Sequence, residues 1–279
     1  MSYTAEISRA NPSCFLFLVD QSGSMADPFG VGESGKRKAD GVAVVINHLL
    51  QNLVIKCAKA EGVRDYYWVG VIGYGARIGP AFAGALSGKE LVPVSEIASS
   101  PARVEERTKK VEDGAGGLVD QKVRFPVWFD AVANGATPMC QALTRAHSIT
   151  EGWLNQHPDC FPPILLNITD GEATDGDPSI PAGSLRALSS TDGNALLFNL
   201  HISSQKAAPI EFPDAEEGLP DQHARLLFGM SSNLPEYMRT FAKQEGFRTS
   251  EDTRGFVFNA DMVAVIRFLD IGTRARELR

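Results

Sequence analysis

Three oxygen-bearing side chains, Asp20, Ser22 and Ser24, follow an apolar run near the start of the chain. The run, Cys14 to Val19, is rich in residues that favour strands and has no charged position, which is typical of a strand buried on both faces. In open α/β sheets, ligands bind at the carboxyl ends of the strands, where this cluster begins. Because only carboxylate and hydroxyl oxygens are offered, the cluster favours Mg²⁺ or Ca²⁺ over zinc.

Two further candidate ligands occur much later in the chain. Asp170 directly follows a second apolar strand, Ile164 to Thr169, and Thr137 precedes Pro138, a residue favoured at the first position of a helix. In a doubly wound sheet the two apolar strands would lie side by side where the strand order reverses, so their carboxyl ends would share one crevice. The order of elements therefore predicts that Asp170 and Thr137 join the first cluster.

Other acidic residues lie in the loops around these candidates. We expect them to act through their charge, or behind the ligands, rather than as ligands; they are Asp27, Glu33, Glu172 and Asp175. A second cation site in the loop from 172 to 177 is not favoured, because acidic loops are usually just solvated.

Alternating strand and helix patterns predict the scaffold. Apolar residues recur at three- and four-residue spacing over 42–57, 139–153 and 262–269, and buried strands are expected at 66–74, 195–202 and 256–258. This alternation indicates an α/β fold with a doubly wound, mostly parallel sheet flanked by helices, and with one antiparallel edge strand near 78–94. We expect a tail over 1–10 and a single domain over 11–279. An irregular insertion is expected at about 84–136, with a short polar helix at 101–110.

Composition excludes several classes of function. The net charge is −7 and the pI is about 5.3, so a nucleic-acid-binding face is not expected; the basic run Lys36 to Lys38 is interpreted as a solvated helix end. No segment is long and apolar enough to cross a membrane, and residues 1–12 do not resemble a signal peptide. The four cysteines are widely spaced, which favours buried thiols in a reducing compartment. The expected location is the cytoplasm.

The full set of motifs strongly resembles the metal-ion-dependent adhesion site (MIDAS) of the von Willebrand factor type A (VWA) family. The family pattern is Asp-x-Ser-x-Ser after the first strand, then a separate Thr, then a separate Asp that is commonly followed by Gly. This sequence has Asp20, Ser22 and Ser24, then Thr137, then Asp170 with Gly171. The resemblance runs from about residue 11 to the last helix and implies a Rossmann-like VWA fold.

The resemblance also implies a role for each residue and a class of partner. The hydroxyls of Ser22, Ser24 and Thr137 would bind Mg²⁺, with Mn²⁺ or Ca²⁺ as alternatives, while Asp20 and Asp170 would hold the cation directly or through water. The cation would then accept a Glu or Asp from another protein. Without disulfides or a leader, the sequence is more similar to intracellular bacterial VWA proteins, including the TerY-like group. That group is tied to stress-response and conflict systems with kinase, phosphatase or ATPase partners.

Two alternatives remain open at this point. A metal-dependent phosphohydrolase would also place an Asp after the first strand, but its haloacid-dehalogenase-type pattern needs a second Asp two residues later, where this chain has Ser22. A structural subunit of an ATPase, kinase or phosphatase assembly could keep the metal site without needing it. The leading interpretation is a non-catalytic module that binds a protein and neither nucleic acid nor membrane.

Overall fold

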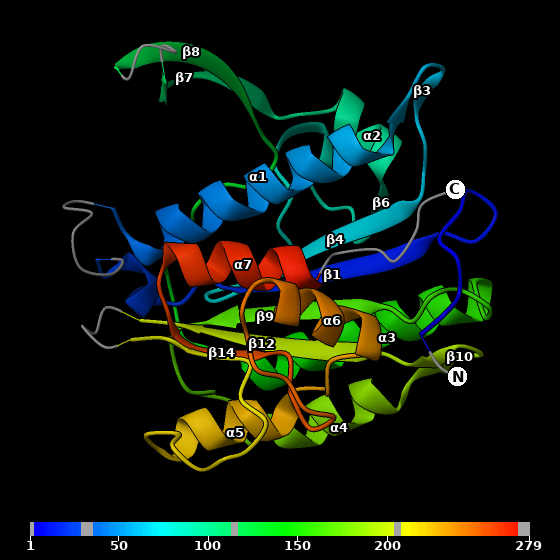
Figure 1. Ribbon diagram of the computed structural model, residues 1–279, viewed down its shortest axis with the longest axis vertical. Coiled ribbons are helices and arrows are strands. Elements are labelled where there is room, and N and C mark those ends of the chain that lie inside the picture. The colour runs from blue at the N-terminus through cyan, green and yellow to red at the C-terminus, as the bar shows by residue number, and fades with distance from the viewer. Residues whose placement is uncertain (1–2, 29–35, 113–116, 204–207, 273–279) are drawn as a thin grey trace.

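A central sheet forms the middle layer of the protein (Figure 1). The structure is a computed structural model that describes residues 3–28, 36–112, 117–203 and 208–272. The strand order is β13-β14-β12-β9-β1-β4-β5, and β6 also pairs with β4. The strands are β1 (Ser13–Asp20), β4 (Tyr67–Tyr74), β5 (Ile78–Pro80), β6 (Val92–Pro93), β9 (Ile164–Thr169), β12 (Leu196–Ile202), β13 (Ile210–Glu211) and β14 (Phe256–Ala260).

The interior strands of this sheet are parallel. Strand β1 pairs parallel with β4 and with β9, and β12 pairs parallel with β9 and with β14. Antiparallel pairing is confined to the edges, where β5 and β6 pair with β4 and the short β13 pairs with β14. The predicted α/β fold with a mostly parallel sheet and an antiparallel edge is confirmed.

Helices cover both faces of the sheet (Figure 1). One face packs against α1 (Lys38–Cys57), α2 (Val94–Ser99), α6 (Glu236–Gln244) and α7 (Met262–Gly272). The other face packs against α3 (Met139–Gln156), α4 (Ser179–Ala187) and α5 (Gln222–Met230). Two short antiparallel pairs lie outside the sheet: β2 (Ala58–Lys59) with β3 (Gly62–Val63), and β10 (Ser189–Ser190) with β11 (Gly193–Asn194). Two 3-10 turns also lie outside it, η1 (Gly23–Ala26) and η2 (Gly84–Leu86).

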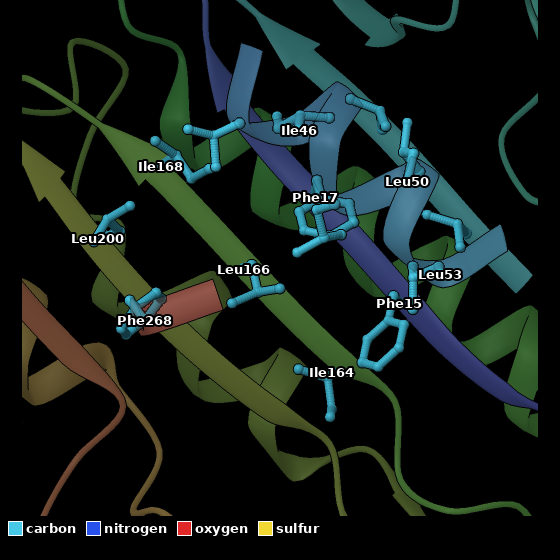
Figure 2. Close-up of a cluster of buried hydrophobic side chains, with 14 of the residues drawn as sticks. Phe15, Phe17, Ile46, Leu50, Leu53, Ile164, Leu166, Ile168, Leu200 and Phe268 are labelled. Carbon is cyan, nitrogen blue, oxygen red and sulfur yellow. The ribbon is translucent and has the colours of Figure 1, made fainter. Parts of the chain in front are cut away.

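Strand β1 has no solvated face, and this explains its apolar sequence. Side chains alternate across a strand, so Phe15 and Phe17 join the cluster of α1 and α7 (Figure 2), whereas Leu16 and Leu18 join the cluster of α3. All eight residues of the strand are buried. The end of β1 is therefore fixed in position by packing from both sides.

The order in which the chain adds strands to the sheet reverses at β1. From β1 the chain passes through α1 to β4 on one side, and it later returns through α3 to β9 on the other side. The helix after β1 is α1 and the helix after β9 is α4, and these two helices cover opposite faces, so the loops after β1 and β9 turn away from each other, as at a switch point of a doubly wound sheet. The predicted neighbourhood of these two strands is confirmed by their pairing, with Val19 opposite Ile168.

The insertion contains a long two-stranded ribbon. Strands β7 (Arg103–Glu112) and β8 (Leu118–Val127) pair antiparallel over their whole length and extend away from the sheet (Figure 1). The polar helix predicted over 101–110 is therefore wrong, and much of the segment from 84 to 136 is regular rather than irregular. The pattern misleads because a ribbon that stands apart has little core to face, so its strands need no alternation of apolar residues. Near its base, the Arg107 guanidinium lies 3.5 Å from the centre of the Phe125 ring.

Aromatic residues at the base of the ribbon and just after it fold back onto the domain. Phe125 of β8 and the following Trp128 and Phe129 are buried, so they form no exposed aromatic patch. Asn47 of α1 holds this segment: its Oδ1 accepts the backbone N–H groups of Trp128 (2.7 Å) and Phe129 (3.1 Å), while its Nδ2 donates to the carbonyls of Ala43 and Phe129.

We predict that Asn47→Ala lowers the free energy of unfolding by about 2–4 kcal/mol, because it leaves the two buried backbone N–H groups without an acceptor. Urea denaturation measures the loss. Asn52→Ala, on the same helix but half-buried, is the control and is expected to change stability by no more than about 0.5 kcal/mol. Equal losses in the two variants would contradict this role of Asn47.

A histidine lies inside the core strand β12. His201 stacks on Phe258 of β14, meets the His223 ring edge-to-face, and accepts the backbone N–H of Asn259 at its Nδ1. Burial is the main cause that lowers the pKa of His201 to about 3, and the neighbouring His223 lowers it further. Burial also lowers the pKa of His223. Both imidazoles are therefore neutral in the folded protein at neutral pH.

We predict that stability falls on acidification from pH 7 to pH 5. The unfolded chain takes up a proton at each imidazole near pH 6.5 while the folded chain does not, so each site costs up to about 1.4 kcal/mol per pH unit below that value. Denaturation in chelator at several pH values measures the slope. His201→Leu should flatten this slope, and a slope insensitive to this substitution would refute the assignment.

Candidate functional site

The site lies at the carboxyl ends of the neighbouring strands β1 and β9. Asp20 is the last residue of β1, and a tight loop then leads through Ser22 into the η1 turn, which contains Ser24. Asp170 directly follows β9. Because the two strands pair in parallel up to Val19 and Ile168, both acids and both serines are brought to the same edge of the sheet.

A continuous series of oxygen atoms links the two loops. Ser22 Oγ lies 3.0 Å from Ser24 Oγ, and Ser24 Oγ donates to Asp170 Oδ1 at 2.8 Å. The Asp170 side chain is fully buried, whereas Ser24 is exposed, so solvent reaches the series from the serine side. These three residues thus lie together as the sequence predicts.

Asp20 has a different place from the hydroxyls. Its carboxylate is buried, with Oδ1 accepting the backbone N–H of Ser22 (2.8 Å) and Oδ2 accepting the hydroxyl of Thr169 (2.7 Å). Burial raises the pKa of this carboxyl, and the hydrogen bonds from Ser22 and Thr169 oppose the rise. The two accepted hydrogen bonds fix the serine loop to β9 beneath the hydroxyls.

Thr137 is held against the same two loops. Its backbone N–H donates to Thr174 Oγ1 and its carbonyl accepts the N–H of Thr174, which ties it to the loop after β9. Its own hydroxyl lies 3.9 Å from the position that a Cβ at residue 171 would occupy, an ordinary contact distance, so Thr137 lies beside Gly171. The N–H of Gly23 donates to the carbonyl of Gly135, which ties the segment before α3 to the serine loop.

Gly135 is needed for this connection. Its φ is +94°, and a Cβ there would lie 2.3 Å from the backbone nitrogen of Ala76. Any other residue would therefore be strained and would clash with the chain after β4. The glycine lets one segment contact both the β4 loop and the β1 loop before it enters α3.

Lys38 is the residue that sequence reasoning missed. It was assigned to a solvated helix end, but only 7 % of its side chain is exposed, and its Nζ lies 2.9 Å from Asp170 Oδ2. This first residue of α1 also lies 3.7 Å from Asp27 Oδ2. The interpretation fails because the side chain of Lys38 extends to Asp170, directly after β9, and not into solvent. A lysine at the start of a helix, where positive charge is disfavoured, is the signal that could have found it.

The other acids predicted near the site differ in position. Asp27 is exposed, and its Oδ2 lies 3.7 Å from Lys38 Nζ. Glu172 is exposed in the loop after β9. Asp175 accepts the backbone N–H groups of Cys140 and Gln141, each at 3.0 Å, so it caps the first turn of α3. Glu33 lies outside the described residues.

The donor set determines what this arrangement can bind. Within the described ranges, no three His, Cys, Asp or Glu side chains form a group that could hold a metal ion, so a site built mainly from those residues is not found there. The site instead offers serine and threonine hydroxyls with two carboxylates, and the ammonium of Lys38 already lies on one carboxylate. These are oxygen ligands of the kind that Mg²⁺ accepts, and the ammonium marks a position where positive charge is stabilised.

No family model matches the sequence, and no curated protein matches it significantly. Solved structures that resemble it distantly include the three N-terminal domains of the type V pili tip protein Mfa5 from Porphyromonas gingivalis and the vWF domain of the same protein. Sequence identities are 11 % and 12 %, and the TM-score is 0.32 in both. Each match covers 58 % of this chain but only 20 % and 39 % of the other chains. This likeness is too distant to transfer a ligand or a partner.

Proposed function

We propose that this chain is a divalent-cation-dependent protein-interaction module of the VWA type, which binds an acidic residue of a partner through Mg²⁺. The observation that carries the proposal is the series of oxygens from Ser22 through Ser24 to Asp170. This series lies beside β1, where the order of strands in the sheet reverses. Asp20 accepts the backbone N–H of Ser22, and Thr137, in the segment before α3, is hydrogen-bonded to the loop after β9, so these two residues would complete the proposed ligand group.

The chemistry of these residues favours a cation that needs one more anionic ligand. Three of the five side chains are neutral hydroxyls, and both oxygens of Asp20 already accept hydrogen bonds from the protein. Asp20 would therefore act mainly by orienting the serine loop, and Asp170 would be the principal charged ligand. A divalent ion held this way keeps net positive charge, which attracts a carboxylate from another protein.

The partner class follows only from the resemblance to TerY-like proteins. We place the module in a bacterial stress-response or conflict system, where the acidic residue would belong to a kinase, phosphatase or ATPase. All four cysteines are free thiols, which fits a cytoplasmic location. None of the described helices is long and apolar enough to cross a membrane.

The hydrogen bonds at the site favour binding over catalysis. The hydrogen bonds of the Ser22 and Ser24 hydroxyls are to each other and to Asp170, so no imidazole acts as a base on either of them among the described residues. A phosphohydrolase would require a second acid two residues after Asp20, where Ser22 stands. We therefore propose a non-catalytic role.

We predict that the protein binds Mg²⁺ or Mn²⁺ and that Ser24→Ala and Asp20→Asn each weaken this binding by about 10- to 100-fold. Ser24→Ala removes a ligand, and Asp20→Asn removes charge behind the ligands. Titration calorimetry measures the affinities. Ser184→Ala on α4 and Asp214→Asn are matched controls at exposed positions and should bind as the unmodified protein does. If the site variants and the controls bind alike, the metal does not use these residues.

The partner is tested by co-purification in Mg²⁺ and in chelator, followed by mass spectrometry. A partner should be retained in Mg²⁺, released by chelator, and lost with Ser24→Ala but kept with Ser184→Ala. Capture of the same partner in chelator would favour the structural-subunit alternative. Hydrolysis of a phosphate ester that disappears in Asp20→Asn would instead establish an enzyme.

A further inference from the structure

Lys38 places its positively charged ammonium inside the proposed cation site. Its Nζ lies 2.9 Å from Asp170 Oδ2, and the other oxygen of this carboxylate accepts the hydrogen bond from Ser24. The side chain of Asp170 is fully buried. The ammonium therefore compensates a carboxylate that water does not reach, which is the task that a bound cation would perform.

The position of Lys38 in its helix makes this contact unusual. It is the first residue of a 20-residue helix, and the positive end of the helix dipole disfavours a cation there. The backbone is fixed as well, because the N–H of Lys38 donates to the carbonyl of Asp27 and the N–H of Asp27 donates to the carbonyl of Ser24. Asp27 thus connects the serine loop by hydrogen bonds to Lys38, the residue that neutralises Asp170.

A second acceptor is within reach of the ammonium. Asp27 Oδ2 lies 3.7 Å from Lys38 Nζ, and its side chain is 61 % exposed. One ammonium thus lies within ion-pair distance of a buried and of an exposed carboxylate. The ammonium can therefore leave Asp170 without losing an ionic partner, and it would gain access to water in doing so.

We propose that Lys38 is a tethered competitor of the metal: its ammonium holds Asp170 while the site lacks a cation, and Mg²⁺ must displace it toward Asp27 in order to bind. This inference rests on the proposed function. Two cations cannot share one carboxylate in a buried site without repulsion, so each bound Mg²⁺ costs the ion pair of Lys38 and Asp170. The lysine thereby sets the Mg²⁺ concentration at which the site is loaded.

Calorimetry with Mg²⁺ alone as the probe tests the competition. Lys38→Met keeps the length of the side chain but removes its charge, and it should bind Mg²⁺ at least about tenfold more tightly than the unmodified protein. Lys38→Arg keeps the charge and should stay within about threefold of it. The rise in melting temperature on adding Mg²⁺ should be largest for Lys38→Met, because tighter binding to the folded state stabilises it more.

The outcomes separate this inference from the proposed function. Equal affinity of Lys38→Met and the unmodified protein would overturn the competition and leave the metal site intact. Binding by Lys38→Met alone would support competition but contradict a metal-dependent function of the natural chain. Absence of binding in both would overturn both proposals.

A measurement on the unmodified protein covers the case in which Lys38→Met does not fold. Acetylation of lysines, followed by mass spectrometry, reports how accessible each ammonium is. Modification of Lys38 should become several-fold faster in Mg²⁺ than in chelator, while Lys89, which forms an ion pair with Glu96 far along the chain, should react at the same rate in both. An unchanged rate at Lys38 would overturn the displacement.

Discussion

Two carboxylates lose most of their water where β1 and β9 end, and much of the surrounding structure compensates for that loss. Asp20 is buried beneath the serine loop, and the Asp170 side chain is buried beside it. A buried carboxylate is tolerated only with hydrogen bonds or an opposite charge. Asp20 receives two hydrogen bonds, whereas Asp170 receives one hydrogen bond and an ammonium.

The backbone around the site is arranged to supply these groups. The segment before α3 is tied to the loop after β1 through Gly135 and Asn134, and to the loop after β9 through Thr137. The first turn of α3 in turn takes its cap from Asp175, which belongs to the loop after β9. The loops around the site therefore position one another.

The fold and the members of the site differ in how well sequence predicts them. Strands such as β1 and β9 are apolar on both faces, so their burial, parallel pairing and adjacent ends follow from the pattern. Asp20, Ser22, Ser24 and Asp170 come together because strand ends locate them. Lys38 could not be placed this way, because its role depends on where the helix begins in space.

The ribbon and Asn47 show the same limit. Residues 103–127 lack the alternation that marks a half-buried strand, because the ribbon packs mainly against itself. Asn47 looks like an ordinary polar helix residue, yet it holds the backbone of Trp128 and Phe129, 81 and 82 positions away. Contacts over such separations leave no periodic trace in the chain.

The ribbon leaves and rejoins the domain at one place, since its first residue, Arg103, pairs with its last, Val127. Anchoring begins at this base, where Phe125 and Val127 of β8 are buried, and continues with Trp128 and Phe129. Only the outer part of the ribbon stands apart from the domain, so the path from β4 to α3 is held by the base alone.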